Sequence, residues 1–308
     1  MNRRELIFGT AAWMASGACF GKTSFAASRR YAETSFGRIA YVERGKGKAA
    51  LFLHGFPLNS FQWRGALELL SGTRRCIAPD FMALGYTEVA PSQDVSPKAQ
   101  TEMLAALLDR LSIESVDLVA SDSGGAVAQL FLARYPKRVR TMLLTNCDAE
   151  IDSPPPALLP VIESAKKGKF VDEWIAPGRA DKASARSAKG IGGQCYVNPA
   201  YPTDEAIEYY WAPLMSSPQK KALVDAYALA LEDNPLRGIE AKLKQSEAPV
   251  RIVWGTADTI FSPQSPVYLD RCFPKSRGVR QLEGRKLFWP EELPNVIAEE
   301  ARRLWSNG

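Results

Sequence analysis

The feature that most constrains the fold of this chain is a turn of small residues around Asp122. A mainly apolar run, residues 116–120, leads into the turn, and residues 127–134 continue from it with apolar side chains at helical spacing. A strand, a sharp turn and a helix in this order form the setting in which a strained turn projects a nucleophile above a sheet. Small residues at Ala120 and Gly124 let the backbone close around the turn. We therefore expect Asp122 to be a nucleophile at the end of a buried strand.

The rest of the chain alternates short apolar or β-branched runs with stretches of helical periodicity. This alternation is typical of a mainly parallel sheet with helices on both faces. We therefore expect an α/β fold with eight strands. The predicted strands are residues 31–34, 38–43, 49–53, 75–78, 116–120, 139–145, 250–254 and 279–282, and the predicted helices are 61–70, 99–111, 124–134, 266–272 and 294–305.

One long region breaks the alternation. Residues 148–239 hold helical pieces, a proline run and several aromatic side chains, and some ninety residues are too many for a loop inside a compact domain. We interpret them as a helical cap inserted into a core made of residues 27–147 and 240–308. Because the cap follows the sixth predicted strand, it would cover the carboxyl ends of the strands, where open α/β sheets bind ligands.

The N-terminus is predicted to be an export signal rather than part of the fold. A short basic head containing Arg3 and Arg4 precedes an apolar stretch, residues 6–20, and small residues around Ala26 offer a cleavage site. The arginine pair resembles a twin-arginine signal, so we expect residues 1–26 to direct export to the periplasm or the medium, with no stable membrane span after cleavage. An uncleaved amphipathic N-terminus and lipidation at Cys19 are the alternatives.

Composition argues against several other classes of protein. The net charge of +5 is modest and unclustered, and no aromatic residues alternate with the basic ones, so we expect no nucleic-acid partner. No Cys or His spacing suggests a metal site, and no nucleotide-binding loop or haem motif appears, so we expect no cofactor and no metal.

Four short motifs in order resemble the α/β-hydrolase superfamily over essentially the full length after the signal. Residues 53–57 match its His-Gly loop, and residues 78–81 followed by Gly85 match its Pro-Asp loop. The helix after the turn ends at residues 135–139 with the spacing of the superfamily, and residues 254–258 match the strand end that carries the triad acid. The resemblance implies an α/β-hydrolase fold, with Asp258 as the acid.

An aspartate nucleophile makes the chain similar to haloalkane dehalogenases, fluoroacetate dehalogenases and epoxide hydrolases. In these enzymes a carboxylate attacks an sp³ carbon to give an ester, which a base-activated water then hydrolyses. The resemblance therefore implies a hydrolase that cleaves a carbon–halogen bond or an epoxide or ether bond. It also implies that the backbone N–H groups of Phe56 and Ser123 stabilise the oxyanion of the second step. His54, the only histidine, is interpreted as a structural residue of its loop.

The chain departs from these families where the catalytic base belongs. Their base is a histidine in a Gly-x-x-His-Phe pattern, and here Gly284 and Phe288 keep the register while Leu287 takes the histidine position. Leucine neither accepts nor donates a proton, and Lys286 is one residue out of register. We expect Asp122 and Asp258 to face one pocket with no imidazole between them, and one of the two to titrate unusually high.

The halide-binding residues are missing as well, because Ser123 and Phe56 stand where haloalkane dehalogenases usually have Trp and Asn or Glu. The arginines that bind fluoroacetate are also absent. Cap tyrosines fit epoxide hydrolases better, where their hydroxyls protonate the opening epoxide. The predicted substrate-binding residues are Asp148, Tyr209, Tyr210 and Trp211.

Three interpretations stay open. The first is an aspartate-nucleophile hydrolase with either an unrecognised base or a water held by carboxylates such as Asp148 and Asp258. The second is a non-hydrolytic enzyme that uses a carboxylate pair, and the third is a catalytically silent protein that binds a small apolar ligand or a partner. A serine hydrolase using Ser121 or Ser123 requires a slipped turn and still lacks a base. The Trp, Tyr and Leu residues of the cap predict a small, mainly apolar substrate.

Overall fold

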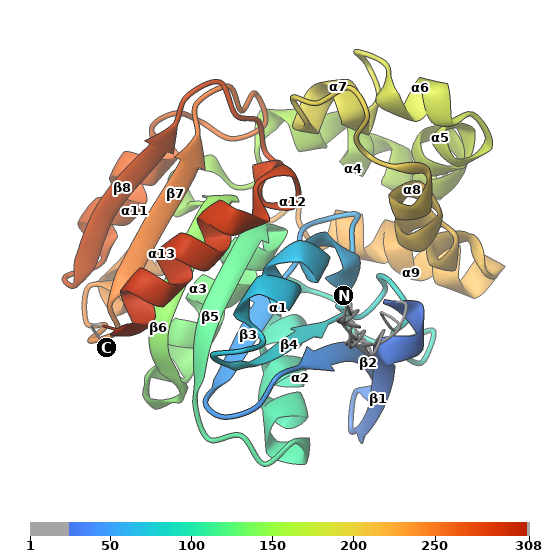
Figure 1. The fold of residues 1–308 in the computed structure, drawn as a ribbon. Helices are drawn as coiled ribbons and strands as arrows, with labels where there is room; N and C mark the ends of the chain where they lie inside the picture. The colour runs from blue at the N-terminus through green and yellow to red at the C-terminus, as the bar shows by residue number, and fades with distance from the viewer. Residues whose placement is uncertain (1–24, 307–308) are drawn as a thin grey trace, which may run out of the picture.

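A computed structural model describes residues 25–306 and contains one eight-stranded sheet with the order β1-β2-β4-β3-β5-β6-β7-β8 (Figure 1). The β1–β2 hairpin is antiparallel and joins β4 in antiparallel fashion, and all other neighbouring strands are parallel. The predicted α/β fold with a mainly parallel sheet is confirmed. The strands are β1 Arg29–Thr34, β2 Gly37–Arg44, β3 Ala49–Leu53, β4 Arg75–Pro79, β5 Val116–Asp122, β6 Val139–Cys147, β7 Val250–Gly255 and β8 Ser276–Leu282.

Helices cover both faces of the sheet. On one face α1 packs against α13, and on the other α2 packs against α3, which follows β5 directly (Figure 1). Every residue of β3 and β5 is buried, as expected for central parallel strands covered on both sides. The helices of the core, on the two faces together, are α1 Arg64–Leu70, α2 Pro97–Arg110, α3 Ser123–Arg134, α10 Glu240–Leu243, α11 Ser265–Cys272, α12 Trp289–Glu292 and α13 Pro294–Ser306.

Residues 148–239, which follow β6 and precede α10, contain helical elements and no strand. These helices lie together beside one end of the sheet, in the green to orange part of the chain (Figure 1). We expected a helical cap in this region, and residues 148–239 are called the cap below. Its main helices are α4 Leu159–Lys166, α5 Ala176–Ala180, α6 Lys182–Arg186, α7 Ile191–Cys195, α8 Asp204–Trp211 and α9 Pro218–Leu229.

The predicted export signal, residues 1–26, lies outside the described residues except for its last two positions. Phe25, the first residue described, is buried, and its ring centroid lies 5.1 Å from that of Phe61 and 5.5 Å from that of Tyr209. Among residues 25–306 no helix combines the length and the apolar character needed to cross a bilayer.

Candidate active site

Asp122 stands at the end of β5 in a backbone conformation that non-glycine residues rarely adopt. Its φ is +56° and its ψ is −137°, so the turn before α3 is strained. Two glycines make the turn possible: a Cβ on Gly55 would lie 2.4 Å from the Cβ of Asp122, and a Cβ on Gly124 would lie 2.5 Å from the carbonyl oxygen of His54. Close packing therefore requires the predicted small residue Gly124, and it also requires a glycine at position 55 of the neighbouring loop.

The two oxygens of the Asp122 carboxyl group have different surroundings. Oδ1 accepts hydrogen bonds from the backbone N–H of Phe56, at 3.3 Å, and from that of Ser123. No described residue donates a hydrogen bond to Oδ2. Two converging backbone donors are the arrangement that stabilises negative charge on an oxygen during acyl chemistry.

Asp122 and Ser123 line a cavity of about 580 Å³ between the core and the cap. Most of the lining is apolar, and much of it comes from the cap. Glu173, Ser187 and Lys189, all exposed, belong to its polar part. The buried apolar part includes Phe56, Val161, Phe170, Ile175, Cys195, Trp211, Leu231, Phe261, Leu287 and Phe288.

Besides Asp122, Asp148 is the buried carboxyl group that lines this cavity. It directly follows Cys147, the residue of β6 that is paired with Asp122 across the sheet. Burial raises the pKa of Asp122 to about 7, and the Asp148 carboxyl adds to the rise. Burial likewise raises the pKa of Asp148 to about 7, against a hydrogen bond of 2.8 Å from the Ser153 hydroxyl to its Oδ1. Of the carboxyl groups that line the cavity, Asp122 and Asp148 are therefore the two buried ones, and they compete for one negative charge near neutral pH.

Asp258 lies beside the site but does not line the cavity, in contrast to the expectation that it faces one pocket with Asp122. Its Oδ2 accepts a hydrogen bond of 2.8 Å from the Asn146 side chain, and its Oδ1 accepts one of 2.8 Å from the backbone N–H of Ile260. Burial raises the pKa of Asp258 to about 6. The expected upward shift is thus present in both Asp122 and Asp258, but the pair that shares the cavity is Asp122 and Asp148.

The position predicted for the base holds an apolar side chain. Leu287 is buried and lines the cavity, while the Lys286 ammonium group donates a hydrogen bond of 2.6 Å to the carbonyl oxygen of Gly193 in the cap. His54 is also not available as a base. Its Nε2 accepts a hydrogen bond of 3.0 Å from the backbone N–H of Phe81, its Nδ1 donates to the carbonyl oxygen of Gly55, and burial lowers its pKa to about 4.

The three predicted aromatic residues of α8 have different positions. Trp211 lines the cavity, and its buried indole N–H has no hydrogen-bond partner within the described part of the chain. Tyr209 and Tyr210 do not line the cavity, because their hydroxyls are engaged elsewhere. The Tyr209 hydroxyl accepts a hydrogen bond of 2.7 Å from Arg29, and the Tyr210 hydroxyl donates one of 2.8 Å to Glu291.

Glu291 connects the cap to the core. Its carboxylate also accepts a hydrogen bond of 2.9 Å from the Tyr196 hydroxyl and pairs with Arg64 of α1 at 2.8 Å. Glu291 thus holds Tyr196 and Tyr210 of the cap against Arg64 of the core. Tyr210 therefore fixes the cap on the core rather than facing a substrate.

Two residues near the site, Tyr227 and Cys195, were not predicted to belong to it. The Tyr227 hydroxyl of α9 lies 3.2 Å from the Ser123 hydroxyl, and its ring stacks on Phe56 with centroids 5.3 Å apart. Cys195 lines the cavity, and its carbonyl oxygen accepts a hydrogen bond of 2.9 Å from the backbone N–H of Phe288. Neither residue belongs to a local motif, so only the packing of the cap on the core could reveal them.

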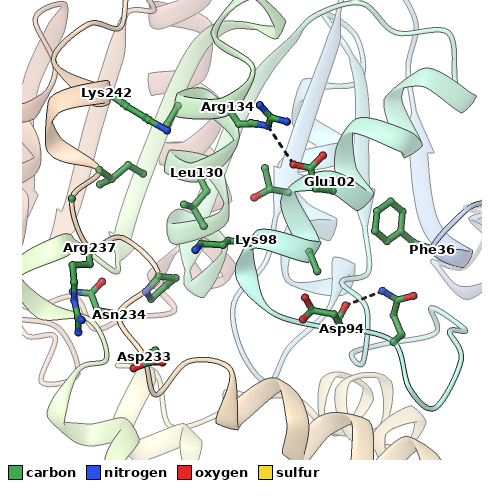
Figure 2. A pocket seen from close by; sticks show the side chains of 17 residues that line it. Phe36, Asp94, Lys98, Glu102, Leu130, Arg134, Asp233, Asn234, Arg237 and Lys242 are labelled. Atoms are coloured by element: carbon green, nitrogen blue, oxygen red, sulfur yellow. Dashed lines mark hydrogen bonds and ion pairs between the residues drawn. The ribbon is translucent and has the colours of Figure 1, made fainter.

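A second hollow, of about 890 Å³, lies between α2, α3 and the segment before α10 (Figure 2). Lys98, Arg134 and Lys242 line it together with acidic side chains, and Arg134 pairs with Glu102 at 3.5 Å. None of the predicted site residues lies in this hollow. The chemistry expected of the chain therefore points to the cavity under the cap.

Comparisons with known proteins agree with the fold described above. Residues 49–289 match the sequence model of a family described as alpha/beta hydrolase fold. The chain is 27% identical over 248 residues to a cis-3-alkyl-4-alkyloxetan-2-one decarboxylase of Shewanella oneidensis, covering 76% of this chain and 74% of that protein. It is 23% identical over 287 residues to haloalkane dehalogenase 2 of Mycobacterium tuberculosis, covering 87% of this chain and 92% of that protein. An α/β-hydrolase fold protein from Burkholderia ambifaria, of solved structure, is similar with a TM-score of 0.76 and 22% identity, over 90% of this chain and 97% of that one.

Proposed function

This chain belongs to the α/β-hydrolase fold family, and on that basis we propose that it is a hydrolase in which Asp122 attacks a small, mainly apolar electrophile. The reaction would resemble those of haloalkane dehalogenases and epoxide hydrolases and cleave a carbon–halogen bond or an epoxide or ether bond. The observation that carries the proposal is the Asp122 carboxyl group itself. Its Oδ1 is held by two backbone donors, and its Oδ2 accepts no hydrogen bond from a described residue, in a cavity that is mainly apolar.

In the first step Oδ2 of Asp122 would attack a substrate carbon and form an ester while the leaving group departs. In the second step water would attack the ester carbonyl, whose oxygen is Oδ1. The N–H groups of Phe56 and Ser123 already contact this atom, so they would stabilise the oxyanion without rearrangement.

The second step lacks its usual base. Leu287 lines the cavity at the position of the histidine, and Asp258 is held by Asn146 rather than by an imidazole. Attack by Asp122 needs no histidine, but hydrolysis of the ester needs a base to activate water. Release of the ester would therefore be the slow step.

The lining of the cavity favours a mainly apolar substrate. Burying an apolar ligand against these side chains is favourable.

A second candidate function is a non-hydrolytic reaction that uses a carboxylate pair. Asp122 and Asp148 line the same cavity, and a relative that matches 76% of this chain is named a decarboxylase. Mass spectrometry of the products separates the two functions, because only hydrolysis adds the elements of water. A protein that binds an apolar ligand without reacting is the third possibility.

The test is intact-mass analysis after incubation with a panel of alkyl halides, epoxides and esters. A reactive substrate should add its alkyl mass to the peptide containing Asp122, and Asp122→Asn should abolish the addition. Turnover without any adduct would show that another group activates water efficiently. A ligand that shifts the melting temperature but gives neither adduct nor product would favour the binding protein.

We also propose that residues 1–26 direct export, on the basis of the Arg3-Arg4 pair and the apolar stretch after it. Replacing both arginines by lysine should then retain the protein in the cytoplasm. Cleavage after Ala26 would remove the Phe25 ring from its contacts with Phe61 and Tyr209. The N-terminal mass of the exported protein tests this cleavage site.

A further inference from the structure

The buried carboxyl group of Asp148 is not needed by the fold in any evident way. It lines the cavity, and its side chain accepts hydrogen bonds from the Ser153 hydroxyl and from the backbone N–H of Asp148 itself. No cationic side chain of residues 25–306 pairs with it, whereas the buried Asp117 pairs with both Arg74 and Arg140. A buried carboxyl group without a cation is costly, and such groups are concentrated at functional sites.

The strand register brings Asp148 close to the proposed nucleophile. Asp122 is paired with Cys147 across β5 and β6, and Asp148 is the next residue. From the spacing of strands and residues in a sheet, the Cα atoms of Asp122 and Asp148 lie on the order of 6 Å apart. Because both carboxyl groups also line the cavity, they can contact the same small substrate.

We propose that Asp148 is a catalytic acid and then a base, which protonates the oxygen that leaves when Asp122 opens a strained cyclic ether and afterwards activates water. This inference rests on the proposed function and names its substrate class. A ring oxygen must gain a proton as its bond to carbon breaks, whereas a halide leaves without one. A neutral carboxyl group in the cavity thus assists ring opening and gives no such help to dehalogenation.

The proton balance closes with these two carboxyl groups. In the first step Oδ2 of Asp122 forms a bond to a ring carbon, the carbon–oxygen bond of the ring breaks, and Asp148 gives its proton to the oxygen. In the second step the Asp148 carboxylate takes a proton from water as the water oxygen attacks the ester carbonyl. The same proton then passes to the departing alcohol. A diol is released, and one proton is left to the Asp122–Asp148 pair, as at the start.

The groups around Asp148 favour its protonated form. None of the titratable side chains that interact electrostatically with Asp148 is cationic. These side chains are Asp122, Asp152, Cys147 and Tyr227. Burial of the Asp148 carboxyl group acts in the same direction and raises its pKa to about 7. A proton is therefore held in the cavity near neutral pH.

The experiment compares two probes of similar size, hexene oxide and hexyl bromide, by measuring the rate of ester formation on Asp122 by quenched-flow intact mass. Asp148→Asn should slow ester formation from the epoxide at least 100-fold and change that from the bromide by less than about threefold. Asp152→Asn is the matched control, since Asp152 is a neighbouring acid that does not line the cavity, and it should leave both rates within about threefold. The ester formed from the bromide should persist longer in Asp148→Asn than in the wild type.

Equal slowing with both probes, or no slowing with either, would overturn the role of Asp148 as an acid. Equal ester lifetimes would overturn its role as a base. If the wild type forms no ester with either probe, the proposed function fails and this inference fails with it.

The pH dependence of the wild type gives a second measurement that needs no variant. Ester formation from the epoxide should decline above about pH 7 while that from the bromide reaches a plateau, and matching profiles would refute the assignment.

Discussion

Replacing Asp122 by Asn should make the protein more stable, and increasingly so as the pH rises. Asn has the shape of Asp and keeps an oxygen for the N–H groups of Phe56 and Ser123, so little packing is lost. What disappears is the cost of a buried negative charge. The carboxyl group is buried, and its pKa is raised from 3.8 to about 7.

The sign and size of the effect follow from linkage. Below pH 3.8 the folded and unfolded chains both hold the proton. Between pH 3.8 and about 7 the unfolded chain loses it first, so the free energy of unfolding of the wild type falls as the pH rises. The total loss is about 4 kcal/mol at pH 8, of which about 2 kcal/mol is already lost at pH 5. Asp122→Asn avoids this loss.

The assay is thermal and urea unfolding of both proteins between pH 5 and pH 8. The shift in melting temperature is the change in the free energy of unfolding divided by the unfolding entropy. For a protein of 308 residues, 4 kcal/mol corresponds to about 6 °C, so the variant should melt about 6 °C higher at pH 8. Asp148 titrates in both proteins, so the difference between the two curves reports the buried charge of Asp122 together with its repulsion of Asp148. Asp117→Asn is the control of opposite sign, because it leaves Arg74 and Arg140 without their buried partner and should cost about 3 kcal/mol or more. A variant that is no more stable than the wild type at pH 8, or a difference that does not grow with pH, would show that the buried charge of Asp122 does not destabilise the protein.

Three further substitutions test the site and its supports. Leu287→His should place an imidazole in the cavity near Asp122 and shorten the lifetime of the ester at least 100-fold, as measured by intact mass over time; an unchanged lifetime would show that position 287 does not reach the ester. Gly55→Ala should abolish ester formation, because the added Cβ falls 2.4 Å from the Cβ of Asp122, and normal labelling would contradict this packing. Glu291→Gln should lower the free energy of unfolding by about 3 kcal/mol at neutral pH, because Arg64 loses its buried partner; urea denaturation measures the loss, and a change below about 1 kcal/mol would show that the cap is held by other contacts.

The sequence predicted the sheet well because its signals are local. Residues 49–53 form β3 with the predicted bounds, since an apolar run between polar residues marks a fully buried strand. β8 begins at Ser276, three residues before its predicted start, because the small and polar residues at its beginning give no apolar signal. The strained turn at Asp122 was also predicted, because small residues on both sides are a local requirement.

Contacts across the cap were the part that the sequence could not give. Tyr209 and Tyr210 were expected at the substrate, but their hydroxyls contact Arg29 and Glu291, which are remote in the sequence. Asp258 was expected to face the cavity, and it turns instead to Asn146. Each outcome depends on which of several hydrogen-bond partners the packed chain offers, and adjacent positions in the sequence carry no information about that choice.

The unequal surroundings of the two Asp122 oxygens have a consequence for the origin of the atoms in the product. In the proposed reaction Oδ1 would remain fixed on the protein by its two N–H donors, while Oδ2 would be the atom that bonds to the substrate. When water cleaves the ester at its carbonyl, Oδ2 leaves within the alcohol and the oxygen of water takes its place in the carboxyl group. The side chain is thus a reagent that is consumed and rebuilt in every cycle. In water enriched in heavy oxygen, the first product carries an ordinary oxygen from the protein, and the isotope appears in Asp122.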